Sequence, residues 1–417
     1  MLDFLVSALW GWHVLLLILA AGVYFSVRSR FFQIRKFFQW VRLPFSRKSR
    51  GGAFGALTAA LGGSIGTGNI VGVATAITVG GPGALFWMWI SSLFGMMTVF
   101  AENFLAARHP GAPGALGYIE KAGKPLAILY AAGCVLSSFG MGNMTQTNAA
   151  AVALEDLGAP WWCVCAGLGG IVFLVARGGL RVAVKITEKL VPAMTLLFFA
   201  ASLGVLWVFR ANLPRAVESI FSGAFSLKAG AGGTAGVLIA LRIGISRGVF
   251  TNEAGLGSSA FAYEGVSNSP VELGCMGIFQ VFLDTLVMCT VTGLCILCCR
   301  SPMLTGAELT FYAYGSALGE WGEKAVSLCT ARFALATVVA WSCYGRSGLL
   351  YLTRGRGKTA YAIAAAIAAV AGCLLPLTAV FQIGDACNGL MALPNLAALF
   401  LCRNELETAS KKENKKA

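Results

Sequence analysis

Long apolar runs separated by short polar segments extend along almost the whole chain. A helix needs about 20 predominantly apolar residues to cross the hydrocarbon core of a bilayer, and several runs exceed that length. The pattern predicts about eleven membrane-spanning helices in one domain covering residues 1–417, with spans near 4–27, 53–80, 84–107, 126–152, 160–176, 189–209, 217–247, 274–299, 329–350, 358–381 and 385–402.

The composition agrees with this pattern. Hydrophobic residues make up 57% of the 417 residues and charged residues only 12%, whereas about a quarter of the residues in an ordinary soluble domain are charged. We therefore expect an all-α integral membrane protein.

Basic residues gather in one set of the connecting segments. The basic and aromatic segment 28–50 predicts an interfacial helix on the cytoplasmic side, which places the N-terminus outside and the tail, 403–417, inside. The Lys and Arg residues then fall on the cytoplasmic side, as the positive-inside rule expects, except for Arg210, Arg215, Lys228, Arg300, Lys324 and Arg332. The net charge of +14 thus reflects topology, and its spread over many loops argues against a nucleic-acid partner.

Residues 62–72 interrupt the second apolar run. They read Gly-Gly-Ser-Ile-Gly-Thr-Gly-Asn-Ile-Val-Gly. Each glycine costs about 1 kcal/mol of helix propensity relative to alanine, and unwound backbone persists at membrane depth only inside protein or beside a wet cavity. The stretch predicts a broken helix whose freed backbone groups bind something small. A close-packing face between helices is the alternative.

A second glycine-rich stretch, 229–236, interrupts the seventh run, five spans after the first. Two spans that are five apart cross the membrane in opposite directions. Residues of about 53–209 and 217–402 would therefore form two inverted repeats, and 4–27 would be one extra N-terminal helix. Interruptions at matching positions of two repeats are typical of a transporter site. Alternatively, 229–236 is an extracellular loop before a short span.

The second half of the first interruption suits an anion. The backbone amides of Gly66, Thr67 and Gly68 open a half-helix, and a helix N-terminus carries partial positive charge. A carboxylate is therefore the expected ligand, and these three residues are candidate substrate-binding residues.

The first half of the same interruption suits a cation. The carbonyls near Gly62 and Ile65 end the preceding half-helix, and free carbonyls at such an end bind a hard cation such as sodium. Oxygen atoms of Ser64 and Asn69 offer further ligands.

Polar residues also gather inside the span 126–152. The segment 142–148 reads Gly-Asn-Met-Thr-Gln-Thr-Asn, and such density within a membrane usually faces a cavity or partner helices. We expect Gln146 to line a substrate pocket, with hydrogen bonding between helices as the alternative.

Two acidic residues are placed deeply within apolar runs. An acid inside a membrane is a functional candidate, so Asp284 is expected to contact the substrate amine or take part in ion coupling, or otherwise to be a buried hydrogen-bond partner. Asp385, at the start of the last span, is either functional or caps its helix.

The segment 247–257 follows the seventh span. Its glycines predict a tight cytoplasmic loop, and Glu253 would pair with Arg242 or Arg247. We expect a gate or a hinge here, because charged pairs at the mouth of a pathway form and break as access changes.

Catalytic and metal-centre functions find little support. The chain has 13 cysteines but only two histidines, His13 and His109, and no histidine lies near the closest cysteine groupings, Cys298-Cys299 and Cys163/Cys165. A zinc, redox or catalytic set of side chains is therefore not expected, and the protein is not expected to be an enzyme.

Three motifs resemble those of the alanine or glycine:cation symporter family. They are the segment 66–89 (Gly-Thr-Gly-Asn-Ile-Val-Gly to Phe-Trp-Met-Trp), the segment 250–258 (Phe-Thr-Asn-Glu-Ala-Gly-Leu-Gly-Ser) and the segment 391–395 (Met-Ala-Leu-Pro-Asn). The resemblance covers nearly the whole chain. It implies two inverted five-helix repeats of the neurotransmitter-sodium-symporter type and import of small neutral amino acids with sodium or protons.

The resemblance also implies roles for individual residues. The amides of Gly66 and Gly68 would hold the substrate carboxylate, the carbonyls of Gly62 and Ile65 with Thr337 would surround one sodium ion, and Ser64 and Asn69 would lie near a second. The sequence departs from the family pattern at Ala336, where a hydroxyl residue is expected, and at Arg346, where an acid is expected.

The sequence therefore predicts a secondary symporter in the cell membrane. It would import alanine or glycine by alternating access, with sodium, or alternatively protons, as the coupling ion. A passive channel or a non-transporting receptor is the alternative, because broken helices also line channels.

Overall fold

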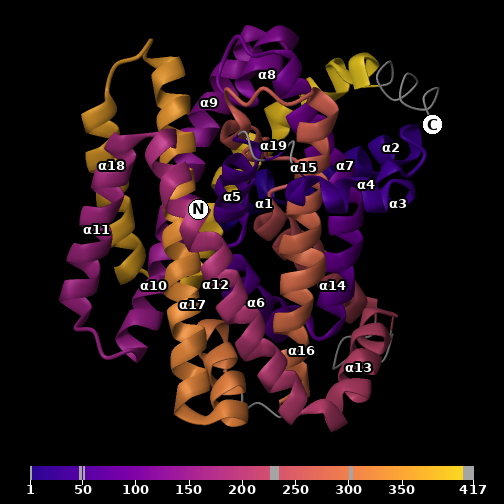
Figure 1. Ribbon diagram of the computed structural model, residues 1–417, viewed down its shortest axis with the longest axis vertical. Helices are drawn as coiled ribbons and strands as arrows, with labels where there is room; N and C mark the ends of the chain where they lie inside the picture. The colour runs from indigo at the N-terminus through magenta and orange to yellow at the C-terminus, as the bar shows by residue number, and fades with distance from the viewer. Residues whose placement is uncertain (1, 47–48, 50–51, 226–233, 300–303, 407–417) are drawn as a thin grey trace.

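The computed structural model describes residues 2–46, 49, 52–225, 234–299 and 304–406. In these residues helices are joined by turns and short loops, and there is no strand (Figure 1). The first helices are α1 (Leu2–Leu9), α2 (Trp12–Arg28), α3 (Phe32–Arg35), α4 (Phe37–Arg42), α5 (Ala53–Ser64), α6 (Val71–Gly80), α7 (Gly83–Arg108), α8 (Leu116–Ala122), α9 (Lys124–Phe139) and α10 (Thr145–Asp156). The later ones are α11 (Trp161–Gly178), α12 (Leu180–Val208), α13 (Leu213–Phe225), α14 (Thr234–Asn252), α15 (Pro270–Val281), α16 (Thr290–Cys298), α17 (Gly306–Leu352), α18 (Lys358–Leu374) and α19 (Leu377–Leu401).

Shorter helical turns join some of these helices. The 3₁₀ turns are η1 (Leu43–Phe45), η3 (Thr67–Asn69), η5 (Arg210–Asn212) and η7 (Ser259–Tyr263). Two π-helical segments, η4 (Gly140–Met144) and η8 (Phe282–Cys289), join α9 to α10 and α15 to α16. Each therefore lies inside one long, locally widened span.

Seven helical stretches of the described chain are long and apolar enough to cross a membrane, or eight if the bent pair formed by α5 and η3–α6 is one span. The chain is therefore a multi-pass helical membrane protein, as predicted. Several predicted runs coincide closely with helices: 84–107 is α7, 160–176 is α11 and 358–381 contains α18.

The seventh predicted run differs, because it contains two helices. In α13 the buried residues Ala216, Ile220 and Ala224 recur every four positions, while Phe221 and Phe225 are exposed. This spacing forms one apolar stripe of an amphipathic surface helix and not a span. The predicted interruption at 229–236 lies mostly outside the described residues.

Two other predicted elements differ as well. Helix α17 begins at Gly306 and not near residue 329, and it bends at Gly319, whose φ of 67° only glycine adopts easily. The single interfacial helix predicted over 28–50 consists of α3, α4 and η1, with left-handed residues at Arg30 and Phe31 before α3.

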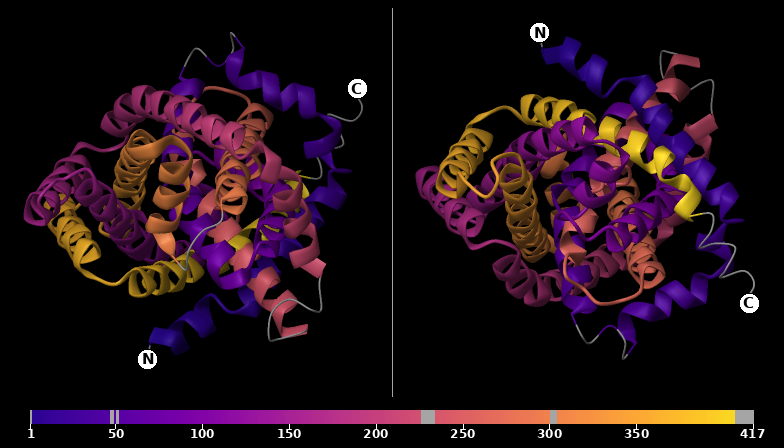
Figure 2. Two further views of the ribbon diagram at one scale, coloured as in Figure 1. Left: turned by 90° about the horizontal axis from the view of Figure 1, so that it is seen from below. Right: turned by 90° about the horizontal axis from the view of Figure 1, so that it is seen from above.

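The helices stand side by side as a bundle, with the N-terminal helices on its outside (Figure 2). At one end of the bundle lie α8, the connection between α17 and α18, and the end of the described chain (Figure 1). Helix α13 and the bend of α17 lie at the opposite end. Segments that the sequence assigns to one side of the membrane therefore share one end of the molecule.

Burial separates central helices from peripheral ones. Every residue of α5 is buried except Phe54, whereas outer helices expose large apolar side chains, among them Leu174, Leu196, Leu203 and Trp207. Such exposed apolar side chains suit contact with lipid, so α5 is at the centre of the bundle.

Candidate functional site

The first interruption breaks the central helix as predicted. Helix α5 ends at Ser64, the backbone leaves the helical region at Ile65 and Gly66, and helical structure resumes in η3 and α6. The two halves meet at an angle of 57°. All the residues of 62–72 are buried, so protein surrounds the unwound backbone, as membrane depth requires.

Two freed amides of this break donate to side-chain oxygens. The Gly66 amide donates to Asn69 Oδ1 at 3.0 Å, and the Thr67 amide donates to Gln146 Oε1 on α10 at 3.0 Å. The structure thus brings Gln146 to the break across 79 positions of sequence. A carboxylate oxygen is chemically similar to the two oxygens that these amides now contact.

Side chains of neighbouring helices approach the glycines of the break so closely that a Cβ atom there would displace them. A Cβ atom on Gly66 would lie 2.4 Å from Thr337 Oγ1 and 2.8 Å from Gln146 Oε1. One on Gly68 would lie 2.5 Å from Thr251 Oγ1 of α14. The glycines therefore let polar atoms of three helices converge on one backbone segment.

The carbonyl half of the break contacts α17. Thr337 Oγ1 donates to Gly62 O at 2.9 Å, so two of the predicted cation ligands adjoin each other. Ser64 Oγ, Thr67 Oγ1 and Thr251 Oγ1 are buried without a hydrogen-bond partner in the described part of the protein. Buried polar groups are nearly always satisfied, so three unpartnered hydroxyls at one place suit a bound ligand.

Asp284 belongs to the same network. Asn69 Nδ2 donates to Asp284 O and to Asp284 Oδ1, both at 2.9 Å. Thr285 donates to Asp284 Oδ2 at 2.8 Å and accepts from Asn252 Nδ2 at 3.3 Å. The network links the first break, η8 and the end of α14. Ser64 and Asn69, predicted to share a cation, have no hydrogen bond between them.

A second helix interruption follows α14. The segment 253–258 turns through left-handed residues, with φ of 60° at Glu253, 92° at Gly255 and 68° at Gly257, before η7 resumes helical structure. Every residue of 253–258 is buried. The glycines thus form the predicted tight turn, but the motif packs within the protein.

Two buried carboxyl groups hold this second turn. Glu253 Oε1 accepts from Trp341 Nε1 at 2.7 Å, and Ser258 donates to Glu253 Oε2. Glu102 Oε1 on α7 accepts from the Gly257 amide at 3.0 Å and from Asn395 Nδ2 at 2.7 Å. Sequence reasoning missed Glu102, although an acid within an apolar run was a usable signal.

The expected pairing of Glu253 with Arg242 or Arg247 is wrong. Arg247 lies within α14 and pairs with Asp385, and its guanidinium is 4.9 Å and 4.8 Å from the ring centroids of Phe250 and Phe381. Asp385 lies well inside α19, which begins at Leu377, so it does not cap that helix. The predicted seventh span ended at residue 247, but α14 continues to Asn252, so Arg247 lies inside the helix and not in a loop.

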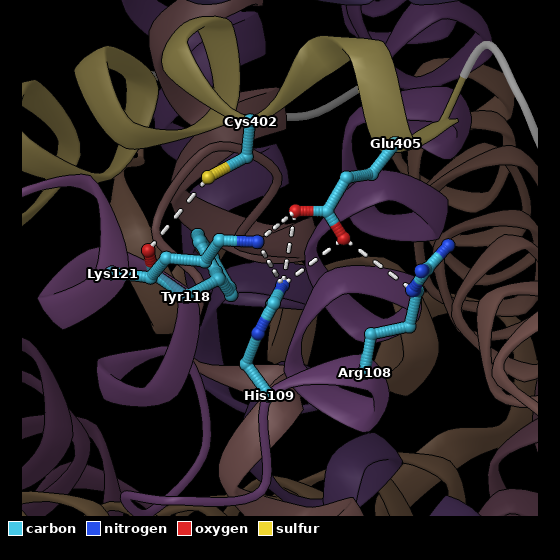
Figure 3. Close-up of polar contacts among 6 residues, drawn as sticks. All are labelled: Arg108, His109, Tyr118, Lys121, Cys402 and Glu405. Carbon is cyan, nitrogen blue, oxygen red and sulfur yellow. Dashed lines mark hydrogen bonds and ion pairs between the residues drawn. The ribbon is translucent and has the colours of Figure 1, made fainter.

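A further charged cluster joins the end of the described chain to α7 and α8 (Figure 3). Glu405 contacts Lys121 Nζ at 2.6 Å, His109 Nε2 at 3.1 Å and Arg108 Nε at 3.4 Å. Partial burial raises the pKa of Glu405, but the contacts with Lys121 and His109 outweigh it and lower the pKa overall. Most of the predicted cytoplasmic tail, 403–417, lies outside the described residues.

Comparison with known proteins gives a family. A model of the sodium:alanine symporter family matches residues 1–416. The sodium/alanine symporter AgcS of Methanococcus maripaludis is 36% identical over 98% of this chain and 95% of its own. The probable sodium/glutamine symporter GlnT of Bacillus subtilis is 32% identical over 97% and 88%. The putative sodium/proton-dependent alanine carrier YrbD of the same organism is 30% identical over 96% and 90%.

Among solved structures, that of Mhp1, a nucleobase-cation-symport-1 family transporter in a closed conformation, matches 79% of this chain and 71% of its own at 14% identity, with a TM-score of 0.44. The sequence relatives are far closer, because they are aligned over nearly their full length. The family match likewise leaves out only the last residue. The chain belongs to the sodium:alanine symporter family.

Proposed function

We propose that this symporter imports small neutral amino acids, alanine or glycine, together with sodium. The observation that carries the proposal is the buried break at 62–72, where convergent amides, carbonyls and unpartnered hydroxyls meet at a helix interruption. Helix interruptions of this kind bind substrate and coupling ion near the membrane midplane. Its family makes the chain a symporter and not an enzyme.

The substrate carboxylate would bind at the amide half of the break. It would take the place of Gln146 Oε1 and Asn69 Oδ1 as acceptor for the amides of Thr67 and Gly66, with Gly68 beside them. A neutral amide oxygen is a weaker acceptor than a carboxylate, so this exchange favours the substrate. Asp284, which accepts from Asn69, would bind the substrate amine.

Sodium would bind at the carbonyl half. The carbonyl oxygens of Gly62 and Ile65 and the hydroxyl of Thr337 form the first ligand group, and Ser64 with Asn69 form a second. The contact of Thr337 with the Gly62 carbonyl supports the first group. Oxygen ligands suit a hard cation. Ala336 cannot supply a further hydroxyl, so we expect the ion to be held with fewer protein ligands.

The proposed architecture has eleven spans with the N-terminus outside. The two breaks, at 65–66 and 253–258, lie in the first helices of two five-helix repeats, α5–α12 and α14–α19, and α1–α2 are the extra helix. The second break replaces 229–236 as the partner of the first. Arg242 and Arg247, which the sequence assigns to the cytoplasmic side, lie within α14, and the asymmetry of the other basic residues supports the orientation.

Active accumulation separates this function from a passive channel or a receptor. In vesicles containing the purified protein, an inward sodium gradient should drive labelled alanine above its external concentration. Uptake that stops at equilibrium indicates a channel. Uptake that ignores both sodium and proton gradients contradicts the proposal.

The topology has a direct test. Cys163 at the start of α11 is the one exposed cysteine, all thirteen lying in the described part of the protein. We expect a membrane-impermeant maleimide to label it from outside intact cells. Labelling only after the cells are permeabilised would reverse the orientation.

A further inference from the structure

A cavity of about 690 Å³ lies between four elements at one end of the bundle. Its lining includes the starts of α5 and α12, the segment after η7 and the C-terminal part of α17. The charged residues of the lining are Lys185, Arg346 and Glu264. None of these residues belongs to the site proposed above.

Within the part of the chain that the structure describes, no ion pair or side-chain hydrogen bond involves Lys185, Arg346 or Glu264. The Arg346 Nε atom is buried and has no acceptor. A buried donor without an acceptor is costly, so the cavity offers a place for a ligand that supplies one.

Two helix starts add to the positive character of this cavity. Gly179 and Gly52, the residues before α12 and α5, both line it, and neither helix has a side-chain cap. A helix N-terminus favours an anion. A Cβ atom on Gly179 would lie 2.1 Å from Arg346 Nη1, so the glycine lets the guanidinium lie against the start of α12.

The same helices connect the cavity to the first break. Helix α5 runs from Ala53, beside the cavity, to Ser64 at the break, about 18 Å at the rise of an α-helix. On α17, Thr337 contacts the break and Arg346 lines the cavity, about 13 Å further along. The cavity is thus at the end of α5 that faces the predicted cytoplasm.

We propose that this cavity is a second, weaker recognition site for the zwitterionic amino acid on its way to or from the cytoplasm. Arg346 and Lys185 would bind its carboxylate, and Glu264 would bind its ammonium group. The inference rests on the proposed function, because it assumes that the cargo is an amino acid. It also gives a role to Arg346, whose charge departs from the family pattern. Charge pairs this close to water are screened, which makes the site weaker than the break.

Sided kinetics test the site. The full chain is reconstituted in vesicles, and labelling of Cys163, at the opposite end of α11 from Gly179, reports its orientation. Sodium-dependent alanine exchange is then measured with alanine varied on each face. The double variant R346Q/K185Q should raise the KM on the cavity face by roughly threefold to tenfold, because it removes both cationic partners of the alanine carboxylate and charge-assisted hydrogen bonds are stronger than neutral ones. The KM on the other face should not change.

Three comparisons make the result decisive. Lys189→Gln removes an exposed positive charge on α12 that does not line the cavity, and it should leave both KM values as in the wild type. Arg346→Lys keeps the charge and should lie near the wild type, whereas Glu264→Gln should raise only the cavity-face KM. Equal KM values for the double variant and Lys189→Gln, or a rise on both faces, would overturn the site. Wild-type protein without sodium-dependent exchange would instead overturn the proposed function.

Discussion

The two helix interruptions differ in what their freed polar groups contact. At the second break, carboxyl groups of Glu253 and Glu102 bind a tryptophan, a serine, an asparagine and a backbone amide. At the first break the partners are neutral amide side chains, and the Ser64 and Thr67 hydroxyls have none among the described residues. Glu102 Oε2 also lacks a partner among the described residues, but the Gly257 amide freed at the second break is bound by a carboxylate, whereas the first break keeps hydroxyls that a ligand can use.

This difference indicates a division of roles. A break whose polar groups are bound by permanent side chains is a fixed structural element, and removing a partner leaves buried groups unsatisfied. At a break whose polar groups contact only neutral side chains, a carboxylate or a cation can replace those side chains as the partner. We therefore expect substitutions at the first break to affect ligand affinity and those at the second to affect stability.

The largest effect should come from filling the first break. In Gly66→Val, the added side chain would occupy the space of Thr337 Oγ1 and Gln146 Oε1, so alanine uptake should fall at least about 100-fold, a loss of about 2.7 kcal/mol in binding. Gly72→Ala is the matched control, because its Cβ would meet only Thr251 Oγ1 at 3.8 Å. A Gly66 variant with normal uptake would remove the break from the site.

Removing the Thr337 hydroxyl should have the next largest effect. Thr337→Ala takes away one proposed sodium ligand and should raise the sodium concentration needed for half-maximal uptake about tenfold, equal to about 1.4 kcal/mol. Thr330→Ala on the same helix is the control, because its hydroxyl donates only to Val326 O. Identical sodium curves for the two variants would contradict the proposed cation ligands.

The second break should respond in stability. Glu102→Ala leaves the Gly257 amide without its acceptor and takes one acceptor from Asn395, so the free energy of unfolding should fall by roughly 1–3 kcal/mol. Thermal unfolding in detergent measures this loss, and Glu102→Gln, which keeps an acceptor oxygen, should lose less. If Glu102→Ala weakened alanine binding at unchanged stability, the division of roles between the two breaks would be wrong.

The smallest effect should arise outside both breaks, at Glu405. Its pairs with Lys121 and Arg108 are partly exposed, so Glu405→Gln should cost at most about 1 kcal/mol. The folded state lowers the pKa of Glu405 from its ordinary value of 4.5, so the stabilisation is present above that value and is lost as the pH falls through the folded pKa. The melting temperatures of variant and wild type should converge in acid, and a difference that grew on acidification would contradict this.

Much of the first break could be predicted from the sequence because its signal is local. Five glycines within an apolar run oppose a continuous helix wherever they occur, and the break at 65–66 follows. The approach of Gln146 and Thr337 depends on contacts across 79 and 275 positions, and no local pattern reports such contacts. The family resemblance supplied Thr337, and only the fold shows the distances.

The second break was missed because its local signals pointed elsewhere. The glycines of 229–236 are denser than those of 253–258, and Glu253 looked like a loop residue. Glu253 can be buried because Trp341 and Ser258 donate hydrogen bonds to its carboxyl group, and the sequence alone does not show these contacts. The sequence marks Arg247 and Asp385 individually as candidate residues, but it does not show that they pair. They are 138 positions apart, and the pair depends on how α14 packs against α19.

Equilibrium binding of labelled alanine to the purified protein, with and without sodium, is the sharpest test of the first break as the site that binds both substrate and ion. We expect that alanine binds at the first break only when sodium is present, that Gly66→Val abolishes binding and that Glu102→Ala leaves the affinity unchanged. Glycine should compete, and large amino acids should not. Equal alanine affinity in the presence and absence of sodium, or normal binding by Gly66→Val, would contradict this assignment.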